Sequence, residues 1–293
     1  MRILLTGGTG QIGREIAGLL RAHTVIAPDR AALDLADAAT VRAAVRTLRP
    51  DLIVNPGAYT AVDRAEEEEA LARKINADAP AVLAEEARRL GVPLIHFSTD
   101  YVFDGNARSP YAEDAVTAPL NAYGRTKLAG EEAVRGSGCI HVILRTSWVY
   151  SRHGRNFLLT IERLAREKPR LTIVDDQFGT PNWARDLARA AVKIALHARD
   201  ELSRKSGIYH LTSQGQTTWH GFAAAIVESM HLEQPPEVAP IRTSEFPTAA
   251  ARPAYTVLDS SKLQRGFGII LPRWQDGLQE CQFDLGRNRT APG

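Results

Sequence analysis

A glycine-rich segment directly behind the first apolar run constrains the fold more than any other feature. Residues Arg2–Thr6 read as a short buried strand, and Thr6-Gly7-Gly8-Thr9-Gly10-Gln11-Ile12-Gly13 follows at once. In the GxxGxxG spacing, one glycine permits a tight turn, one lets backbone approach a pyrophosphate, and one allows close helix-on-strand packing. A helix that begins here offers free N–H groups to an anion. We predict a dinucleotide-binding loop, with a purely structural turn as the alternative; its residues are Gly7, Thr9, Gly10, Gln11, Ile12 and Gly13.

The remainder of the first half alternates apolar runs with helical patterns. The expected strands are Arg2–Thr6, Thr24–Ala27, Leu52–Asn55, Leu94–Ser98 and Val142–Arg145. The expected helices are Gly10–Arg21, Ala38–Leu48, Ala61–Leu71, Ala79–Leu90 and Asn121–Val134. This alternation predicts an α/β fold of Rossmann type, a doubly wound parallel sheet with helices on both faces. Such a sheet hosts many functions, so the fold alone leaves the activity open.

The regularity weakens after about residue 150. Helical patterns at Phe157–Arg166, Ala184–His197 and Trp219–Ser229 and strand-like runs at Leu171–Val174 and Ile208–Leu211 stand among proline-bearing loops. We expect residues 1–150 to form a dinucleotide-binding Rossmann domain and 151–293 mainly a smaller α/β substrate-binding region over the sheet's carboxyl edge. Because the chain is expected to cross between the two, later segments should return to the first domain.

The charge balance excludes several classes of partner. The 293 residues hold 36 Lys and Arg against 34 Asp and Glu, a net charge of +2, which gives no case for nucleic acid or an anionic membrane. No apolar run approaches the roughly 20 residues of a membrane-spanning helix, and Thr6-Gly7-Gly8 interrupts the N-terminal run too early for a signal peptide. The chain has only two cysteines, Cys139 and Cys281, far apart in the sequence, which exclude a disulfide scaffold and a four-thiolate zinc site and suit a cytoplasmic protein.

Two residues behind the second expected strand give conflicting signals about the cofactor. Asp29 would hydrogen-bond a ribose 2′-hydroxyl and favour NADH, whereas Arg30 would pair with a 2′-phosphate and favour NADPH. Solvated loop charges are the alternative for both. Asp34 and Leu35 would flank the adenine, and Asp34 is equally suited to cap the following helix. The preference between NADPH and NADH stays open.

The pair Tyr123 and Lys127 is spaced i, i+4, so both side chains share one helix face. A neighbouring ammonium stabilises a phenolate, so we expect Lys127 to lower the phenol pKa from its usual value near 10 and make Tyr123 a general acid. Lysine also suits the ribose hydroxyls of a nicotinamide nucleotide. An exposed helix pair is the alternative.

A third element, Ser98-Thr99-Asp100-Tyr101-Val102-Phe103, directly follows the apolar run Leu94–Phe97. A hydroxyl at a strand's carboxyl end would donate to a substrate carbonyl or tune the tyrosine; a turn or cap residue is the alternative. The acidic run Glu66–Glu69 cannot converge on a metal, because consecutive helical residues point around the axis. We interpret it as a solvated helix end.

These elements occur in the order found in the extended short-chain dehydrogenases/reductases, and the chain resembles their sugar-nucleotide branch. It is most similar to the dTDP-4-dehydrorhamnose reductase family, and the similarity runs through Leu271–Trp274. The matching motifs are Asn55–Asp63, Ser98–Phe103, Pro119–Glu131, Leu144–Tyr150 and Asp176–Gly179.

The resemblance implies a role for each matching residue. Tyr123 would be the proton donor, Lys127 its partner and ribose ligand, and Thr99 the third catalytic group. Ala58, Tyr59, Thr60 and Phe97 would join the loop and the Asp29–Leu35 residues in holding NADPH or NADH. The residues that would meet the substrate are Thr99, Asp100, Trp148 and Arg252, the last of these at its pyrophosphate. A surface ion pair is the alternative for Arg252.

Three departures from the family pattern stand out. Pro56-Gly57 replaces a usual pair of alanines, and Arg125 stands where an acidic residue is common, on the outer side of the helix. Some relatives dimerise around a magnesium ion held by glutamates. Glu15 is present here, but Arg185 replaces the expected partner, so we predict no metal.

The implied activity is reduction of the C4 ketone of dTDP-4-dehydro-L-rhamnose, the last step toward dTDP-L-rhamnose for cell-envelope polysaccharide. The protein would be a monomer or homodimer whose partner is its nucleotide-sugar substrate. Two alternatives stay open: a non-catalytic NADP-binding regulatory subunit of the same fold, and a related sugar-nucleotide reductase, epimerase or dehydratase. Tyr101 stands where a dehydratase needs a glutamate, which weighs against the dehydratase.

Overall fold

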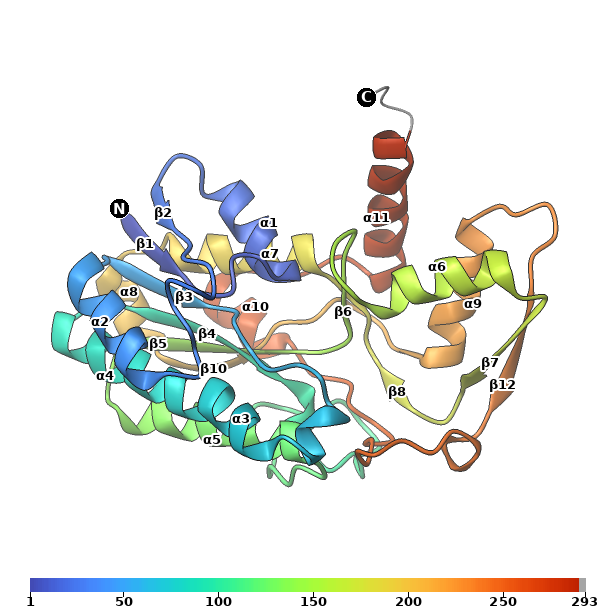
Figure 1. The fold of residues 1–293 in the computed structure, drawn as a ribbon, viewed down its shortest axis with the longest axis horizontal. Helices are drawn as coiled ribbons and strands as arrows, with labels where there is room; N and C mark the ends of the chain where they lie inside the picture. The colour runs from blue at the N-terminus through green and yellow to red at the C-terminus, as the bar shows by residue number, and fades with distance from the viewer. Residues whose placement is uncertain (290–293) are drawn as a thin grey trace.

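A computed structural model describes residues 1–289, and the side chains of residues 1–283. Its centre is a six-stranded parallel sheet in the order β10-β5-β4-β3-β1-β2 (Figure 1). The order reverses beside β1, as in a doubly wound sheet. The strands are β1 (Arg2–Leu5), β2 (Thr24–Ile26), β3 (Leu52–Asn55), β4 (Leu94–Thr99), β5 (His141–Thr146) and β10 (Gly207–His210).

The two faces of the sheet bury alternate residues of each strand. Ile3 and Leu5 of β1 pack into one core cluster, and Leu4 packs into the other. This period of two explains why the strands read as continuous apolar runs, since both faces are covered by helices. The Rossmann-type prediction is confirmed.

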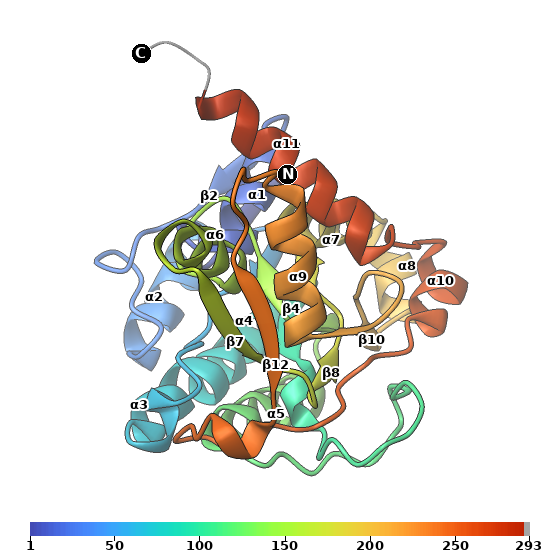
Figure 2. The same ribbon diagram turned by 90° about the vertical axis from the view of Figure 1, so that its right-hand side faces the viewer.

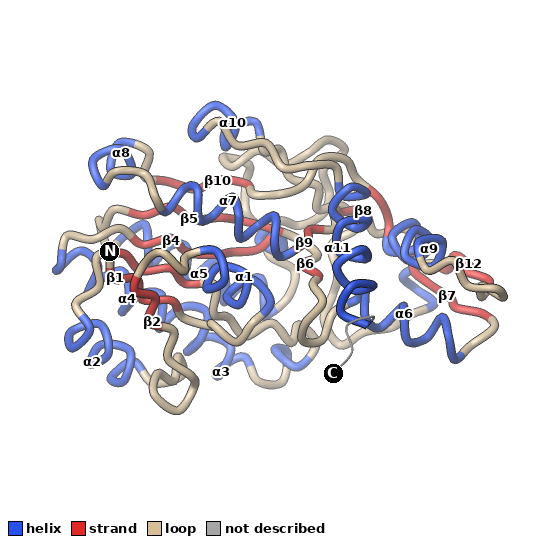
Figure 3. The backbone as a smooth tube through the Cα atoms, turned by 90° about the horizontal axis from the view of Figure 1, so that it is seen from above, coloured by secondary structure: helices blue, strands red, loops and turns tan. Residues whose placement is uncertain are grey.

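Helices α1 (Gln11–Leu19), α7 (Ala184–Ala195), α8 (Arg199–Arg204) and α10 (Ser261–Phe267) supply side chains to the first cluster. Helices α2 (Ala38–Leu48), α4 (Ala79–Leu90) and α5 (Ala122–Gly136) supply the second. Figure 3 shows α1 and α7 crossing the same face of the strands. Three of the helices that pack into the first cluster, α7, α8 and α10, come from beyond residue 150. Later segments therefore complete the core of the main sheet.

The smaller region lies at the carboxyl edge of the sheet (Figure 2). It has its own apolar core around Trp183, Phe222 and Trp274. Among residues 1–289, no helix is long and apolar enough to span a membrane. The region's elements are β6 (Val149–Tyr150), α6 (Phe157–Glu167), β7 (Arg170–Val174), β8 (Phe178–Gly179), β9 (Asn182–Trp183), β11 (Thr217–Thr218), α9 (Trp219–Ser229), β12 (Glu237–Ile241) and α11 (Trp274–Arg289).

Two sequence-based expectations need correction. The strand expected at Ile208–Leu211 does not belong to the smaller region, because β10 pairs with β5 and closes the main sheet. The helix expected at Ala61–Leu71 is a 3₁₀ turn at Arg64–Glu66 followed by α3 (Glu69–Arg73), which continues through a π-helical turn at Lys74–Asp78 into α4.

The acidic run bears on the second correction, because part of it is tied to other segments. Glu67 and Glu69 are exposed and Glu69 begins α3, as expected for a solvated helix end, whereas Glu66 and Glu68 make specific contacts. Glu66 Oε1 accepts a bond from the backbone N–H of Ala122, 2.8 Å away. The Glu68 carboxylate accepts from the Tyr59 hydroxyl and from Arg64. These contacts hold the run in an irregular turn, and periodicity in the sequence does not report them.

Candidate active site

The glycine loop forms the floor of a cavity of about 490 Å³ at the carboxyl edge of the sheet. A Cβ atom on Gly13 would lie 2.1 Å from the carbonyl oxygen of Gly7, so only glycine lets α1 pack this close to the loop. Gly7 itself has a φ of +56°, and a Cβ there would lie 2.7 Å from Gly57 Cα. Gly10 precedes α1 with no side-chain cap, so the first N–H groups stay available to an anion.

The cavity gathers residues from six separate segments of the chain. No Asp or Glu lines it, and its two cationic lining residues are Lys127 and Arg155. These features fit an anionic dinucleotide. The lining residues are Gly7, Thr9, Gly10, Gln11, Ile12, Gly13, Pro56, Gly57, Ala58, Thr60, Phe97, Ser98, Tyr123, Lys127, Thr146, Val149, Gly154 and Arg155.

Ala58 and Thr60, two of the residues predicted at the adenosine half, line this cavity. The other predicted residues at positions 29–35 lie outside it, in the segment after β2. Asp29 Oδ1 accepts from the N–H of Ala32 at 3.0 Å, and Arg30 faces Asp34 at 3.7 Å across an exposed ion pair. Asp34 does not cap α2; that capping residue is Asp37. Leu35 packs toward Gly57, and the Tyr59 N–H donates to Asn76 Oδ1 at 2.8 Å.

Tyr123 and Lys127 both line the cavity from α5, as the i, i+4 spacing predicts. The Lys127 side chain is buried, and its Nζ donates to the backbone oxygen of Phe97 at 2.7 Å. This bond ties α5 to the carboxyl end of β4. Asn121 caps the helix by accepting from the N–H of Gly124 at 2.8 Å, so α5 starts at Ala122, one residue before Tyr123.

The expected direction of the tyrosine pKa is wrong. Burial raises the pKa of Tyr123 to about 12, although a hydrogen bond with Thr99 acts the other way. Burial also lowers the pKa of Lys127 to about 8, so the ammonium is itself disfavoured. Desolvation outweighs the attraction that the sequence spacing suggests. In the protein alone the phenol therefore carries its proton at neutral pH.

Thr99 and Asp100 lie at the end of β4, next to the cavity but not among its lining residues. Thr99 Oγ1 accepts from the N–H of Tyr101 at 3.1 Å and donates to Asp100 Oδ1 at 3.0 Å. It is therefore a cap residue as well as a neighbour of the phenol. Asp100 is buried, and burial raises the pKa of its carboxyl to about 7.

Trp148 and Arg252 lie on the side of the smaller region. The Trp148 indole stacks on Trp219 with centroids 3.6 Å apart, and its backbone φ is +42°. A Cβ on Gly179 would lie 2.5 Å from the indole. Arg252 donates to Asp63 Oδ2 at 2.7 Å and lines a second cavity of about 260 Å³ beside Trp219.

Sequence reasoning missed several lining residues. Ser98 and Thr146 are buried, and their hydroxyls have no hydrogen-bond partner among the described residues. Both stand at carboxyl ends of strands, where the rule that singled out Thr99 would also have found Thr146. Arg155 lies in a loop, and no local pattern marks it.

Comparisons with known proteins agree with this geometry. Residues 1–286 match the model of the family described as RmlD substrate binding domain. The chain belongs to this family.

The curated relatives and solved structures extend the match over nearly the whole chain. A dTDP-4-dehydrorhamnose reductase of Burkholderia thailandensis is 44% identical, over 97% of this chain and 99% of that protein. The crystal structure of a dTDP-4-dehydrorhamnose reductase from Clostridium acetobutylicum has a TM-score of 0.91 at 38% identity, covering 98% and 100% of the two chains. The Bacillus anthracis reductase, solved in complex with NADP, has a TM-score of 0.88 at 34% identity, covering 97% and 99%.

The residues that depart from the family pattern make specific contacts in the structure. Arg125 pairs with Glu69 at 2.9 Å on the exposed side of α5. Gly57 fits closely: a Cβ there would lie 2.6 Å from Leu35 Cδ1 and 3.0 Å from Thr6 Oγ1. Arg185 donates to Glu15 at 2.9 Å, placing a guanidinium against the carboxylate that we considered as a metal ligand. Within the described residues no cluster of three His, Cys, Asp or Glu could hold a metal.

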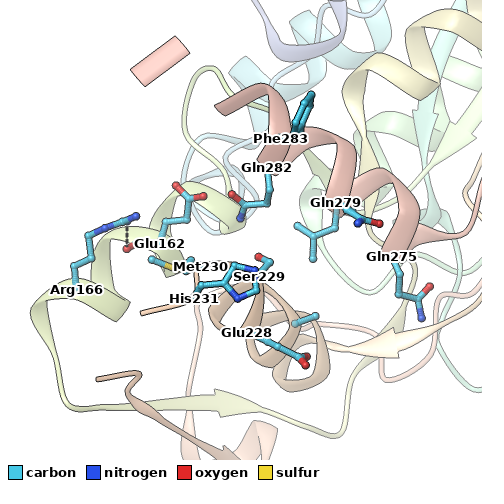
Figure 4. A pocket seen from close by; sticks show the side chains of 12 residues that line it. Glu162, Arg166, Glu228, Ser229, Met230, His231, Gln275, Gln279, Gln282 and Phe283 are labelled. Atoms are coloured by element: carbon cyan, nitrogen blue, oxygen red, sulfur yellow. Dashed lines mark hydrogen bonds between the residues drawn. The ribbon is translucent and has the colours of Figure 1, made fainter. Parts of the chain in front are cut away.

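A further cavity, of about 760 Å³, lies between α6, α9 and α11 (Figure 4). Its walls carry mixed polar side chains such as Glu162, His231 and Gln279. It shares no lining residue with the dinucleotide cavity, so we assign it no part in the site.

Proposed function

We propose that this protein reduces the C4 ketone of dTDP-4-dehydro-L-rhamnose to dTDP-L-rhamnose, with NADPH or NADH as reductant. The observation that carries this proposal is the placement of Tyr123 and Lys127 in one cavity with the glycine loop. Family membership supports the substrate class, since the relatives act on this ketone according to their names. A related sugar-nucleotide substrate is the alternative outcome of the test below.

The proposed roles follow from protonation state and position. When bound, the reduced nicotinamide supplies the hydride. The neutral Tyr123 phenol donates its proton to the C4 oxygen, for which a pKa of about 12 keeps it protonated at neutral pH. Thr99 bonds the phenol and orients it. The Lys127 ammonium, fixed on the Phe97 carbonyl, stabilises the negative charge that develops as the proton leaves.

The second cavity suits the nucleotide part of the substrate. Aromatic side chains of Phe157, Trp219 and Phe246 line it, and Gln177 and Thr248 add polar groups that a pyrimidine edge would meet. We propose that the base enters here, stacked against the aromatic walls.

Arg252 stands at the same cavity and would bind the pyrophosphate. Asp63 Oδ2 accepts a hydrogen bond from Arg252 Nη2 at 2.7 Å, while the buried Nη1 of Arg252 has no partner among the described residues. A guanidinium held in this way presents the remaining donor to phosphate oxygens. Asp63 also accepts from the N–H of Ala250 at 3.1 Å, which fixes the segment that carries Arg252.

The decisive experiment follows the absorbance of NADPH and of NADH at 340 nm with dTDP-4-dehydrorhamnose, for wild type and Tyr123→Phe. We expect oxidation by wild type and a loss of roughly 10²- to 10⁴-fold in the variant. Faster oxidation of NADH would support a contact of Asp29 with the ribose 2′-hydroxyl. Faster oxidation of NADPH would support a contact of Arg30 with the 2′-phosphate. Cofactor binding without oxidation would overturn the reductase assignment and favour the regulatory subunit or a different sugar nucleotide.

Three further proposals accompany this function. Residues 1–150 would form the NAD(P)-binding domain, with β10 and α10 returning to it, and 151–293 would mainly bind the substrate. The enzyme would act as a monomer or homodimer without nucleic acid. Its cytoplasmic location is proposed because Cys139 and Cys281 form no disulfide.

A further inference from the structure

The segment Ser151–Asn156, here called the strap, connects β6 of the smaller region to α6 (Figure 1) and is hydrogen-bonded to the glycine loop. Gly154 and Arg155 of the strap line the same cavity as Gly10, Gln11 and Ile12. Gly154 has a φ of +75°, a left-handed conformation that lets the strap turn here. The cavity is thus closed on one side by a segment from beyond the first 150 residues.

One side chain of the glycine loop holds the strap in place. Gln11 Oε1 accepts from Ser151 Oγ and from Asn156 Nδ2, each at 2.9 Å. Asn156 Nδ2 also donates to the backbone oxygen of Ser151 at 2.8 Å. Oδ1 of the Asn156 amide accepts from the N–H of Leu159 at 3.1 Å and so caps the start of α6. Gln11 therefore joins the start of α1 to the start of α6.

The charges around the cavity single out Arg155. A dinucleotide brings a pyrophosphate with two negative charges, and Lys127 and Arg155 are the cationic residues that line the cavity. The Lys127 ammonium is buried and engaged by Phe97. Arg155 is exposed and forms no ion pair with a described residue. Its guanidinium is thus available to phosphate oxygens over the loop.

We propose that Arg155 binds the pyrophosphate of the dinucleotide, and that the bonds to Gln11 position the strap for this contact. The inference rests on the proposed function only for the class of cofactor. The pyrophosphate is favoured over the adenosine 2′-phosphate because none of Asp29, Arg30 and Asp34, the residues expected at that ribose, lines the cavity with Arg155. The smaller region would then contribute directly to cofactor binding.

The test is direct titration of the protein with NADH and with NADPH, followed by fluorescence of the reduced nicotinamide, without sugar substrate. We expect Arg155→Ala to weaken both by a similar factor of about 10 to 100, and Arg155→Lys to recover part of the loss. Arg21→Ala removes the same charge beyond the other end of α1 and should change neither affinity.

The outcomes separate the inference from the proposed function. If Arg155→Ala lost affinity for NADPH alone, the pyrophosphate assignment would be overturned in favour of the 2′-phosphate. If its affinity for both dinucleotides were unchanged, the role of Arg155 would be overturned. If wild type bound neither dinucleotide, the proposed function itself would fail.

The positioning role of the strap is tested by a double-mutant cycle. Ser151→Ala should weaken dinucleotide binding when Arg155 is present and have little further effect in the Arg155→Ala background. Equal effects in both backgrounds would show that the Gln11 bonds do not act through Arg155. Thermal unfolding of each variant checks that it is folded before titration.

Discussion

The Nζ of Lys127 donates to the backbone oxygen of Phe97 across 2.7 Å, which joins the middle of α5 to the end of β4. The lysine is almost fully buried, and no carboxylate pairs with it within salt-bridge distance among the described residues. Burial lowers the pKa of this ammonium to about 8. Burying an ammonium whose charged form is disfavoured costs folding stability. Its presence here agrees with a role at the site.

Lys127→Met is expected to reduce turnover by at least 10²-fold without lowering the unfolding temperature at pH 7. The folded pKa lies below the unfolded value, so the unfolded state binds more protons between about pH 8 and 10.5. Wild-type stability should therefore rise with pH across this window, and the rise should be absent in the variant. Thermal unfolding at several pH values measures both. A variant that unfolds well below wild type at pH 7 would contradict the buried-ammonium account.

Asp100→Asn is expected to stabilise the protein at pH 8, because the carboxyl has a folded pKa of about 7 against an ordinary value of 3.8. Between these values the folded state binds more protons, so wild-type stability falls as pH rises from about 4 to 7. The amide keeps an oxygen that can accept from Thr99. We expect the gain at pH 8 to be on the order of a few kcal/mol and absent at pH 3. Denaturant titrations at the two pH values provide the check.

Gly57→Ala should weaken dinucleotide binding and destabilise the fold by roughly 1–3 kcal/mol, since the added methyl meets Leu35 at 2.6 Å. Combining it with Leu35→Ala removes the colliding atom and should restore part of the binding. Titration with NADPH and chemical denaturation of both variants measure the effect. No recovery in the double variant would place the collision elsewhere, with Thr6 as the next neighbour at 3.0 Å.

Asp63→Ala is expected to raise KM for the sugar nucleotide about 10-fold with little change in kcat, because Arg252 loses the carboxylate that orients it. Arg252→Ala should raise KM at least as much. Arg242→Ala, which removes an exposed arginine after β12, serves as a matched control. Steady-state kinetics with varied sugar nucleotide give the values. A fall in kcat alone would argue against a binding role for this pair.

Several elements in both regions follow from local pattern. The observed bounds of β3, α2, α4 and α9 are those expected from periodicity. These elements bury their apolar faces in a regular way, so spacing and composition report them well. The glycine loop and the Tyr123–Lys127 pair were also predictable, because each is a short motif whose geometry is set by neighbouring residues.

What the sequence by itself determined was therefore the Rossmann-type layer structure and the short motifs at its carboxyl edge. Only the tertiary structure decided that β10 joins the main sheet and that Arg252 meets Asp63, 189 positions away. It also decided the directions of the pKa shifts at Tyr123 and Lys127, and it placed Arg155 over the glycine loop. The reason is physical: desolvation and long-range contacts depend on which distant segments surround a side chain, and no local spacing encodes those neighbours.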